Sequence, residues 1–172
     1  MLVYKLTNQK LTTHDGCAWV IGEWHSTDGH GNLCGPGWLH AYTDPLLAVL
    51  LNPMHAAFVA PRLFEAEADG DIRLAHGLQI GATKMRLTAE MPLPVVTTQQ
   101  RVRFGILCAR HACSDPAWNR WADQWLSVSV EDQTAKAAWA ARAARAAREV
   151  AIGQQCDLIA IARQATGSCS QT

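Results

Sequence analysis

The spacing of apolar residues changes near Thr97, and this change is the feature that most constrains the fold. Before it, RLFEAEA at 62–68 and TKMRLTAE at 83–90 alternate apolar and polar side chains with a period of two, as half-buried strands do. After it, apolar residues recur at helical spacing. We therefore expect an α+β fold, with a small, mostly antiparallel sheet in the N-terminal half packed against C-terminal helices.

Glycine content and charge divide the chain at the same place. Nine of the 12 glycines precede residue 100. Residues 1–100 carry six Lys/Arg against nine Asp/Glu, and residues 101–172 carry nine against six, so the halves have formal charges of −3 and +3. We expect a strand- and turn-rich α+β portion over 1–96 and a helical portion over 97–172, within one domain overall.

Several short segments of the first portion have strand or turn character. The segments at 2–7 and 17–21 have the apolar and β-branched content of strands, and Asp15-Gly16 between them favours a hairpin. Asp69-Gly70 likewise predicts a turn after the strand at 62–68. Residues 22–37 form a glycine-rich loop, which at this length is more often functional or mobile than inert.

The segment that follows this loop predicts a strand and then a helix. WLHAY at 38–42 has strand character. Thr43, Asp44 and Pro45 form a helix start, because Thr can cap free N–H groups and Pro tolerates the first turn. We expect this helix to stop at Pro53.

The second portion predicts three helices. Thr97 and Gln100 have capping-box spacing, and the helix that they begin ends near His111. The second helix starts at 114–116 and carries tryptophans at i, i+3 and i+7. These could stack on bases, but the helix has few cations, so core packing is the stronger interpretation. An alanine-rich third helix begins near Asp132. This helix carries a series of arginines, Arg142, Arg145 and Arg148. We interpret them as a solvent-exposed stripe, and contact with an acidic partner is the alternative.

Charge and hydropathy exclude several classes of protein. Fifteen basic and 15 acidic residues cancel, so a nucleic-acid-condensing role is not expected. No apolar run is long enough for a membrane span, and the first residues lack the apolar region of a secretory signal. We expect a cytoplasmic protein without membrane contact, whose six cysteines are reduced.

Cysteines and histidines give one candidate metal site. Zinc requires imidazole or thiolate ligands in a tetrahedral arrangement. Cys108 and His111 would share a helical face and could join two ligands from the glycine-rich segment, for which His25 and Cys34 are candidates alongside His30 and His40. The alternative is that the cysteines are core hydrophobes and the histidines are polar loop residues.

Two carboxylates form a second candidate site. Glu65 and Glu67 lie two positions apart on a predicted strand and therefore on one face. Such a pair can orient a ribose hydroxyl, stabilise an oxocarbenium-like centre, or share a proton. A solvated strand face is the alternative interpretation.

The segment CGPGWLHAYTDPLLAV resembles a motif of small domains of unknown function from phages and bacteria. The strand with Tyr4, the Gly-Trp-Leu-His strand, the following helix and the strand with Glu65 and Glu67 are, more distantly, similar to the core of ADP-ribosyltransferases. That similarity implies NAD near Tyr4, His40 and Tyr42, with one glutamate as the catalytic residue.

The sequence therefore supports two functional hypotheses. The first is an intracellular binding or accessory module, phage-encoded or bacterial, that acts through contacts with a protein partner. The second is an NAD-dependent ADP-ribosyltransferase-like enzyme. Apart from the NAD implied by the resemblance and the candidate zinc, the identity of any cofactor is unknown from the sequence.

Overall fold

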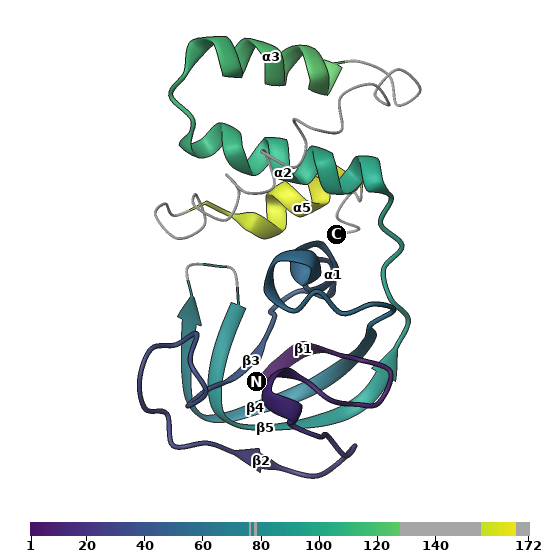
Figure 1. The fold of residues 1–172 in the computed structure, drawn as a ribbon, viewed down its shortest axis with the longest axis vertical. Helices are drawn as coiled ribbons and strands as arrows, with labels where there is room; N and C mark the ends of the chain where they lie inside the picture. The colour runs from purple at the N-terminus through teal and green to yellow at the C-terminus, as the bar shows by residue number, and fades with distance from the viewer. Residues whose placement is uncertain (76, 78, 128–155, 168–172) are drawn as a thin grey trace. The chain divides into compact units, whose positions relative to one another are not determined.

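The computed structural model describes residues 1–75, 77, 79–127 and 156–167 of the chain (Figure 1). The chain divides into two compact units, Met1–Val95 and Val96–Thr172. The first holds the described strands and one α-helix, and the second holds the remaining helices. The prediction of an α+β fold with a mostly antiparallel N-terminal sheet is confirmed.

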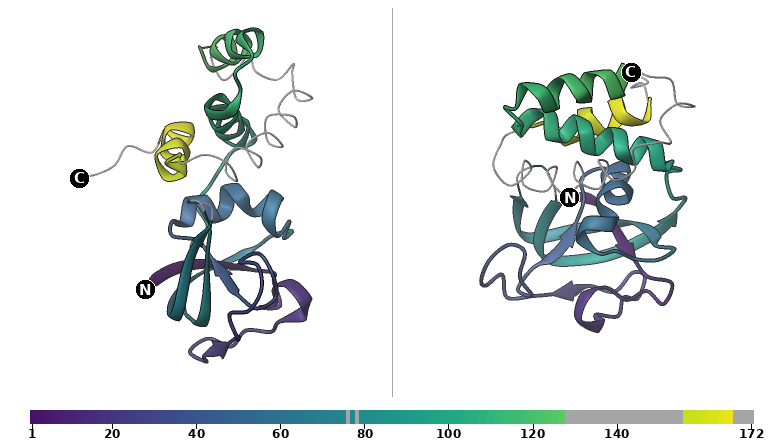
Figure 2. Two further views of the ribbon diagram at one scale, coloured as in Figure 1. Left: turned by 90° about the vertical axis from the view of Figure 1, so that its left-hand side faces the viewer. Right: turned by 45° about the horizontal axis from the view of Figure 1, so that its top comes forward.

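The first unit is built on a five-stranded antiparallel sheet in which β4 and β5 form a long hairpin (Figure 2). The strand order is β1-β4-β5-β2, and β3 pairs with β5 as well. In addition, Tyr4 and Tyr42 exchange two backbone hydrogen bonds of 2.8 Å. The strand bounds are β1 Leu2–Thr7, β2 His25–Ser26, β3 Leu39–Ala41, β4 Arg62–Ala75 and β5 Gln79–Met91.

Three predictions of local structure in this unit are wrong, and the first concerns the expected hairpin. Residues 17–21 do not pair with β1. Ala18 and Ile21 make only isolated bridges, and β1 pairs with β4 along its whole length. His14–Gly16 forms a short 3-10 turn, η1, so the loop folds back on itself. The reason is that the buried face of β4, far along the chain, supplies β1 with a longer partner.

Asp69-Gly70 is also no turn, because β4 runs through it with a shift of register between Asp69 and Ile72. Gly70 has φ +74, and a Cβ there would lie 2.3 Å from Thr83 Oγ1. The same hydroxyl accepts a hydrogen bond from Asp71 N at 2.9 Å. A glycine with positive φ occurs in β-bulges as well as in turns, so the Asp-Gly sequence does not distinguish the two and the predicted turn is wrong.

Helix α1, Pro45–His55, starts where predicted, but its cap is Asp44 and not Thr43. The Asp44 side chain accepts from Leu46 N at 2.8 Å. It continues past Pro53, contrary to the prediction that it stops there. The Asn52 amide ends it instead, by donating to Phe58 O at 3.0 Å and accepting from Phe58 N at 3.1 Å.

Both faces of the sheet in the first unit carry buried residues. Leu6 and Leu63, which pair in the register, are buried on the face that carries Tyr4, and a larger cluster is buried on the other face, called the core face below. The register places Val3 beside Ala66 and Lys5 beside Phe64, and all four are buried. Met85 and Leu87, which the alternation at 83–90 places on one face, are also part of this core. The other members of the cluster are Trp19, Leu39, Ala41, Ala68, Ile80 and Ala82.

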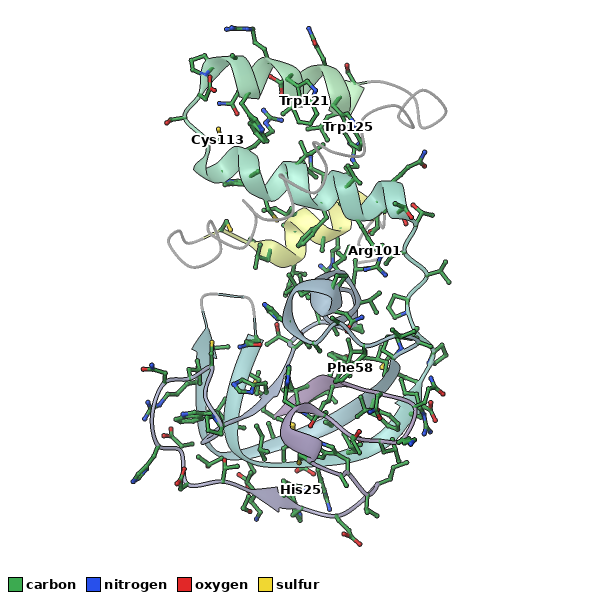
Figure 3. The ribbon with its side chains drawn as sticks, viewed as in Figure 1. His25, Phe58, Arg101, Cys113, Trp121 and Trp125 are labelled. Carbon is green, nitrogen blue, oxygen red and sulfur yellow. The ribbon has the colours of Figure 1, made fainter. Side chains whose placement is uncertain are left out.

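In the second unit the described helices are α2 Thr98–Ala112, α3 Pro116–Ser127 and α5 Leu158–Thr166. The predicted capping box of Thr97 and Gln100 is present. Trp121 and Trp125 lie on the side of α3 that faces α2, where Trp125 is buried with Ile106 (Figure 3), so the prediction of core packing is confirmed.

The last described helix packs against α2, and Gln100 Nε2 donates to Thr166 O at 3.0 Å. It has its own N-cap, because the Asp157 side chain accepts from Ala160 N. The helix predicted from Asp132, with its arginines, lies outside the described residues. No helix in the described ranges has both the length and the apolar character needed to cross a membrane.

Candidate functional site

A row of four side chains, two exposed and two half-buried, crosses the sheet on the face opposite Val3 and Phe64. The register pairs Leu2 with Glu67 and Glu67 with Arg86. Since His25 pairs with Met85, Trp24 lies opposite Arg86 at the β2 end of the row. The order across β1, β4, β5 and the start of β2 is therefore apolar, acidic, basic and apolar. We call this set the sheet-face row.

Short contacts connect the inner members of this row. Arg86 donates to Glu67 Oε2 from Nε at 2.9 Å and from Nη2 at 2.6 Å. The Arg86 guanidinium carbon also lies 4.7 Å from the centroid of the Trp24 ring. The indole is therefore placed by a cation that is itself held by a carboxylate, which restricts its motion.

A second pair of charges lies beside the row. Asp69 pairs with Lys84 in the register, and Lys84 Nζ lies 3.8 Å from Asp69 Oδ2. Lys84 Nζ also lies 4.6 Å from the Trp24 centroid, so two cations contact this indole. The outer face of β4 presents acids and that of β5 presents bases, and the four charges sum to zero.

The two predicted catalytic carboxylates have different surroundings. Glu67 is bound by Arg86 through Oε2, so its carboxylate is held in an ion pair. Glu65 is half-buried and pairs with Tyr4 in the register. Both lie on the side of the sheet opposite the core face, as the period of two predicts.

Three predicted residues occupy consecutive positions across neighbouring strands. Tyr4 pairs with Glu65 on one side and bridges Tyr42 on the other. Tyr42 Oη lies 3.0 Å from His55 Nδ1, so α1 is on this side of the sheet. Burial raises the pKa of Tyr42, which keeps the phenol protonated and able to donate to His55.

The third predicted nucleotide-binding residue, His40, precedes Tyr42 by two positions on β3. Its Nε2 lies within hydrogen-bond distance of Leu33 O. Burial lowers the pKa of His40, and the nearby charges of Lys5 and His14 act in the same direction, whereas the Leu33 contact opposes them. His40 therefore favours the neutral form, with Nε2–H donating to the carbonyl.

A buried amine on the core face was missed by the reasoning from sequence. Lys5 is 6% exposed, and its Nζ donates to His40 O at 2.6 Å. It lies 4.6 Å from the Trp19 ring, which in turn lies 4.3 Å from the His25 ring. The alternation of Val3, Lys5 and Thr7 already put this lysine on the apolar face of β1 and could have indicated its burial.

The predicted zinc ligands lie in different surroundings. Cys108 is buried in α2, and burial raises the pKa of its thiol to about 12, which disfavours the thiolate that zinc requires. His111 and Cys34 are exposed, and the His25 ring contacts that of Trp19 at a tilt of 34°. Among the described residues no group of three or more His, Cys, Asp or Glu side chains could hold a metal ion. The zinc hypothesis stays a prediction that elemental analysis of the purified chain would decide.

Comparisons with known proteins place the chain in a family. Searches of curated proteins and of solved structures give no match. The family model of a domain of unknown function, DUF7666, matches residues 1–99, which include all of the first unit and more than half of the chain. The chain therefore belongs to the DUF7666 family of domains of unknown function.

Proposed function

We propose that this chain is an intracellular binding or accessory module, of phage or bacterial origin, that acts through protein contacts at its sheet-face row. The observation that carries the proposal is the exposed indole of Trp24, 36% accessible and contacted by Lys84 and Arg86. Tryptophan and arginine are the residue types most enriched where binding energy concentrates in protein interfaces.

The contacts around Trp24 favour binding for two reasons. The ring is already placed by two cations, so little side-chain entropy is lost when a partner covers it. The adjacent charges are paired within the sheet by Glu67 and Asp69, so a partner does not have to bury an unpaired charge.

The experiment compares capture of proteins from a bacterial lysate by the immobilised full chain and by Trp24→Ala. Val59→Ala is the matched control, because Val59 is 89% exposed and lies outside the row. We expect Val59→Ala to retain the captured protein and Trp24→Ala to lose it. Equal capture by both variants would contradict the proposal, and so would an unaltered chain that binds neither a lysate protein nor a second copy of itself.

A second candidate is NAD-dependent ADP-ribosyl transfer. The observation that favours it is the adjacency of Tyr42, which follows β3, with Tyr4 on β1 and Glu65 on β4. In this function the tyrosines bind the nucleotide with His40. The Glu65 carboxylate stabilises the oxocarbenium-like ribose as nicotinamide leaves. Glu67 is the weaker of the two glutamates for that role, because Arg86 already binds its carboxylate.

Isothermal titration with NAD and an assay of nicotinamide release in the presence of lysate proteins test this candidate. Glu65→Gln is expected to abolish release while binding persists, and Glu90→Gln is the control, since Glu90 pairs with Arg62 instead. Absence of both heat and release from the unaltered chain would remove the enzyme hypothesis.

A further inference from the structure

The sheet-face row is complementary to itself. Across the four strands it reads Leu2, Glu67, Arg86 and Trp24, and the second pair of charges, Asp69 and Lys84, repeats the acid-then-base order. The midpoint of both patterns lies between β4 and β5. A half-turn about an axis through that midpoint, parallel to the strands, exchanges acids with bases and one apolar end with the other.

We propose that the occupant of this face is a second copy of the chain, related by such a twofold axis; the inference rests on the proposed function and names its partner. Each Glu67 then lies opposite Arg86 of the other copy, and each Asp69 lies opposite its Lys84. Leu2, 58% exposed, lies opposite Trp24 of the other copy. An interface of this kind is isologous and closes on two subunits, so it does not propagate into a filament.

The charge pattern selects this occupant over others. The two acid–base pairs sum to zero and Glu65 adds a negative charge to the same face, so a uniformly acidic partner such as nucleic acid meets more repulsion than attraction there. A second copy instead turns each isolated ion pair into an alternating network of charges. Networks of exposed charges contribute more than isolated exposed pairs do.

The sheets of such a dimer keep their strands aligned, because rotation about an axis parallel to the strands preserves the strand direction. Aligned packing is one of the two ordinary ways in which sheets stack face to face. The charges lie at the centre of the contact and the apolar residues at its two ends. Dimerisation is therefore expected to weaken as the salt concentration rises.

The test is sedimentation velocity of the full chain over a broad dilution series, with three variants. E67R places bases on both β4 and β5, so the copies repel each other, and we expect dimerisation to weaken by about tenfold or more. The exchange E67R/R86E restores the complementary order and is expected to restore the dimer. E90R is the matched control, because it breaks an ion pair of the same type outside the row and should leave the dimer unchanged.

Mixing provides a sharper outcome. In a mixed dimer the exchanged variant would place acid opposite acid and base opposite base, so we expect it to pair with itself and not with the unaltered chain. A monomeric unaltered chain, equal dimerisation of E67R and E90R, or free mixing of the exchanged variant would each overturn the inference. If the unaltered chain is monomeric but its capture of a lysate protein still depends on Trp24, only the dimer fails and the proposed function stands.

Discussion

The ammonium group of Lys5 lies 4.6 Å from the centroid of the Trp19 ring and donates a hydrogen bond to the carbonyl oxygen of His40. This amine is held among the apolar side chains of the core face, where Lys5 pairs with Phe64. Burial lowers the pKa of Lys5 from 10.5 to about 8. The charged amine therefore raises the free energy of the folded state through lost hydration, whereas in the unfolded state it is fully hydrated.

This cost makes stability depend on pH in a defined direction. Below about pH 8 Lys5 is charged in both states, and the full cost of about 3 kcal/mol is present. As the pH rises from about 8 to 10.5 the folded amine is neutral while the unfolded amine still binds a proton, so the free energy of unfolding rises. Lys5→Met should lack this rise and be at least as stable as the unaltered chain at pH 7, because the lost hydrogen bond is smaller than the cost removed.

Urea unfolding of the unaltered chain and of Lys5→Met between pH 7 and pH 10.5 measures the difference in their free energies of unfolding. Groups that both proteins share, such as Cys108, titrate alike in both and therefore do not contribute to this difference. A constant difference across that range, or a clearly less stable Lys5→Met at pH 7, would show that Lys5 is not buried as a costly charge.

Gly70→Ala is expected to destabilise the first unit by about 2 kcal/mol or more. The new Cβ would meet Thr83 Oγ1 at 2.3 Å, and φ of +74 is unfavourable for alanine. Gly16→Ala is the matched control, since Gly16 has φ +71 with nothing within 4 Å and should lose only about 1 kcal/mol. Chemical denaturation measures both, and equal losses would show that the bulge adapts to the extra atom.

Thr97→Ala should lower the stability of the second unit by about 1 kcal/mol. Gln100 N loses its acceptor at the N-terminus of α2, whereas the bond from the backbone N–H of residue 97 to the Gln100 side chain can persist. Thr98→Ala, one position into the helix, is the control and should change little. Thermal unfolding followed by circular dichroism at 222 nm, the usual helix wavelength, compares them, and equal melting temperatures would contradict the cap.

The cysteines are expected to differ in reactivity toward iodoacetamide. Cys34 is exposed and should be alkylated first, whereas Cys108 is buried and burial raises its pKa to about 12. Mass spectrometry of peptides after short exposure at pH 8 gives the order, and all six cysteines should react in denaturant. Rapid alkylation of Cys108 in the folded chain would show that α2 opens readily.

Local rules within the sequence were sufficient for much of the secondary structure. The period of two located the faces of β4 and β5, including the shared face of Glu65 and Glu67. The Thr97–Gln100 spacing located the start of α2. These features depend on residues within a few positions of one another, so the alternation of side chains and the capping of free N–H groups determine them without knowledge of the fold.

Strand pairing and burial were decided by the tertiary structure. Alternation places Lys5 on one face of β1, but only pairing with β4 encloses it beside Phe64. The sequence likewise shows an acid at Glu67 and a base at Arg86, but only the strand register brings the two side chains together. The register also brings Trp24, from a segment that was interpreted as a loop, against the same guanidinium. The physical reason is that hydrogen bonding between strands depends on partners far apart in the chain, and the free energy of burying each face selects among pairings that the local sequence permits equally.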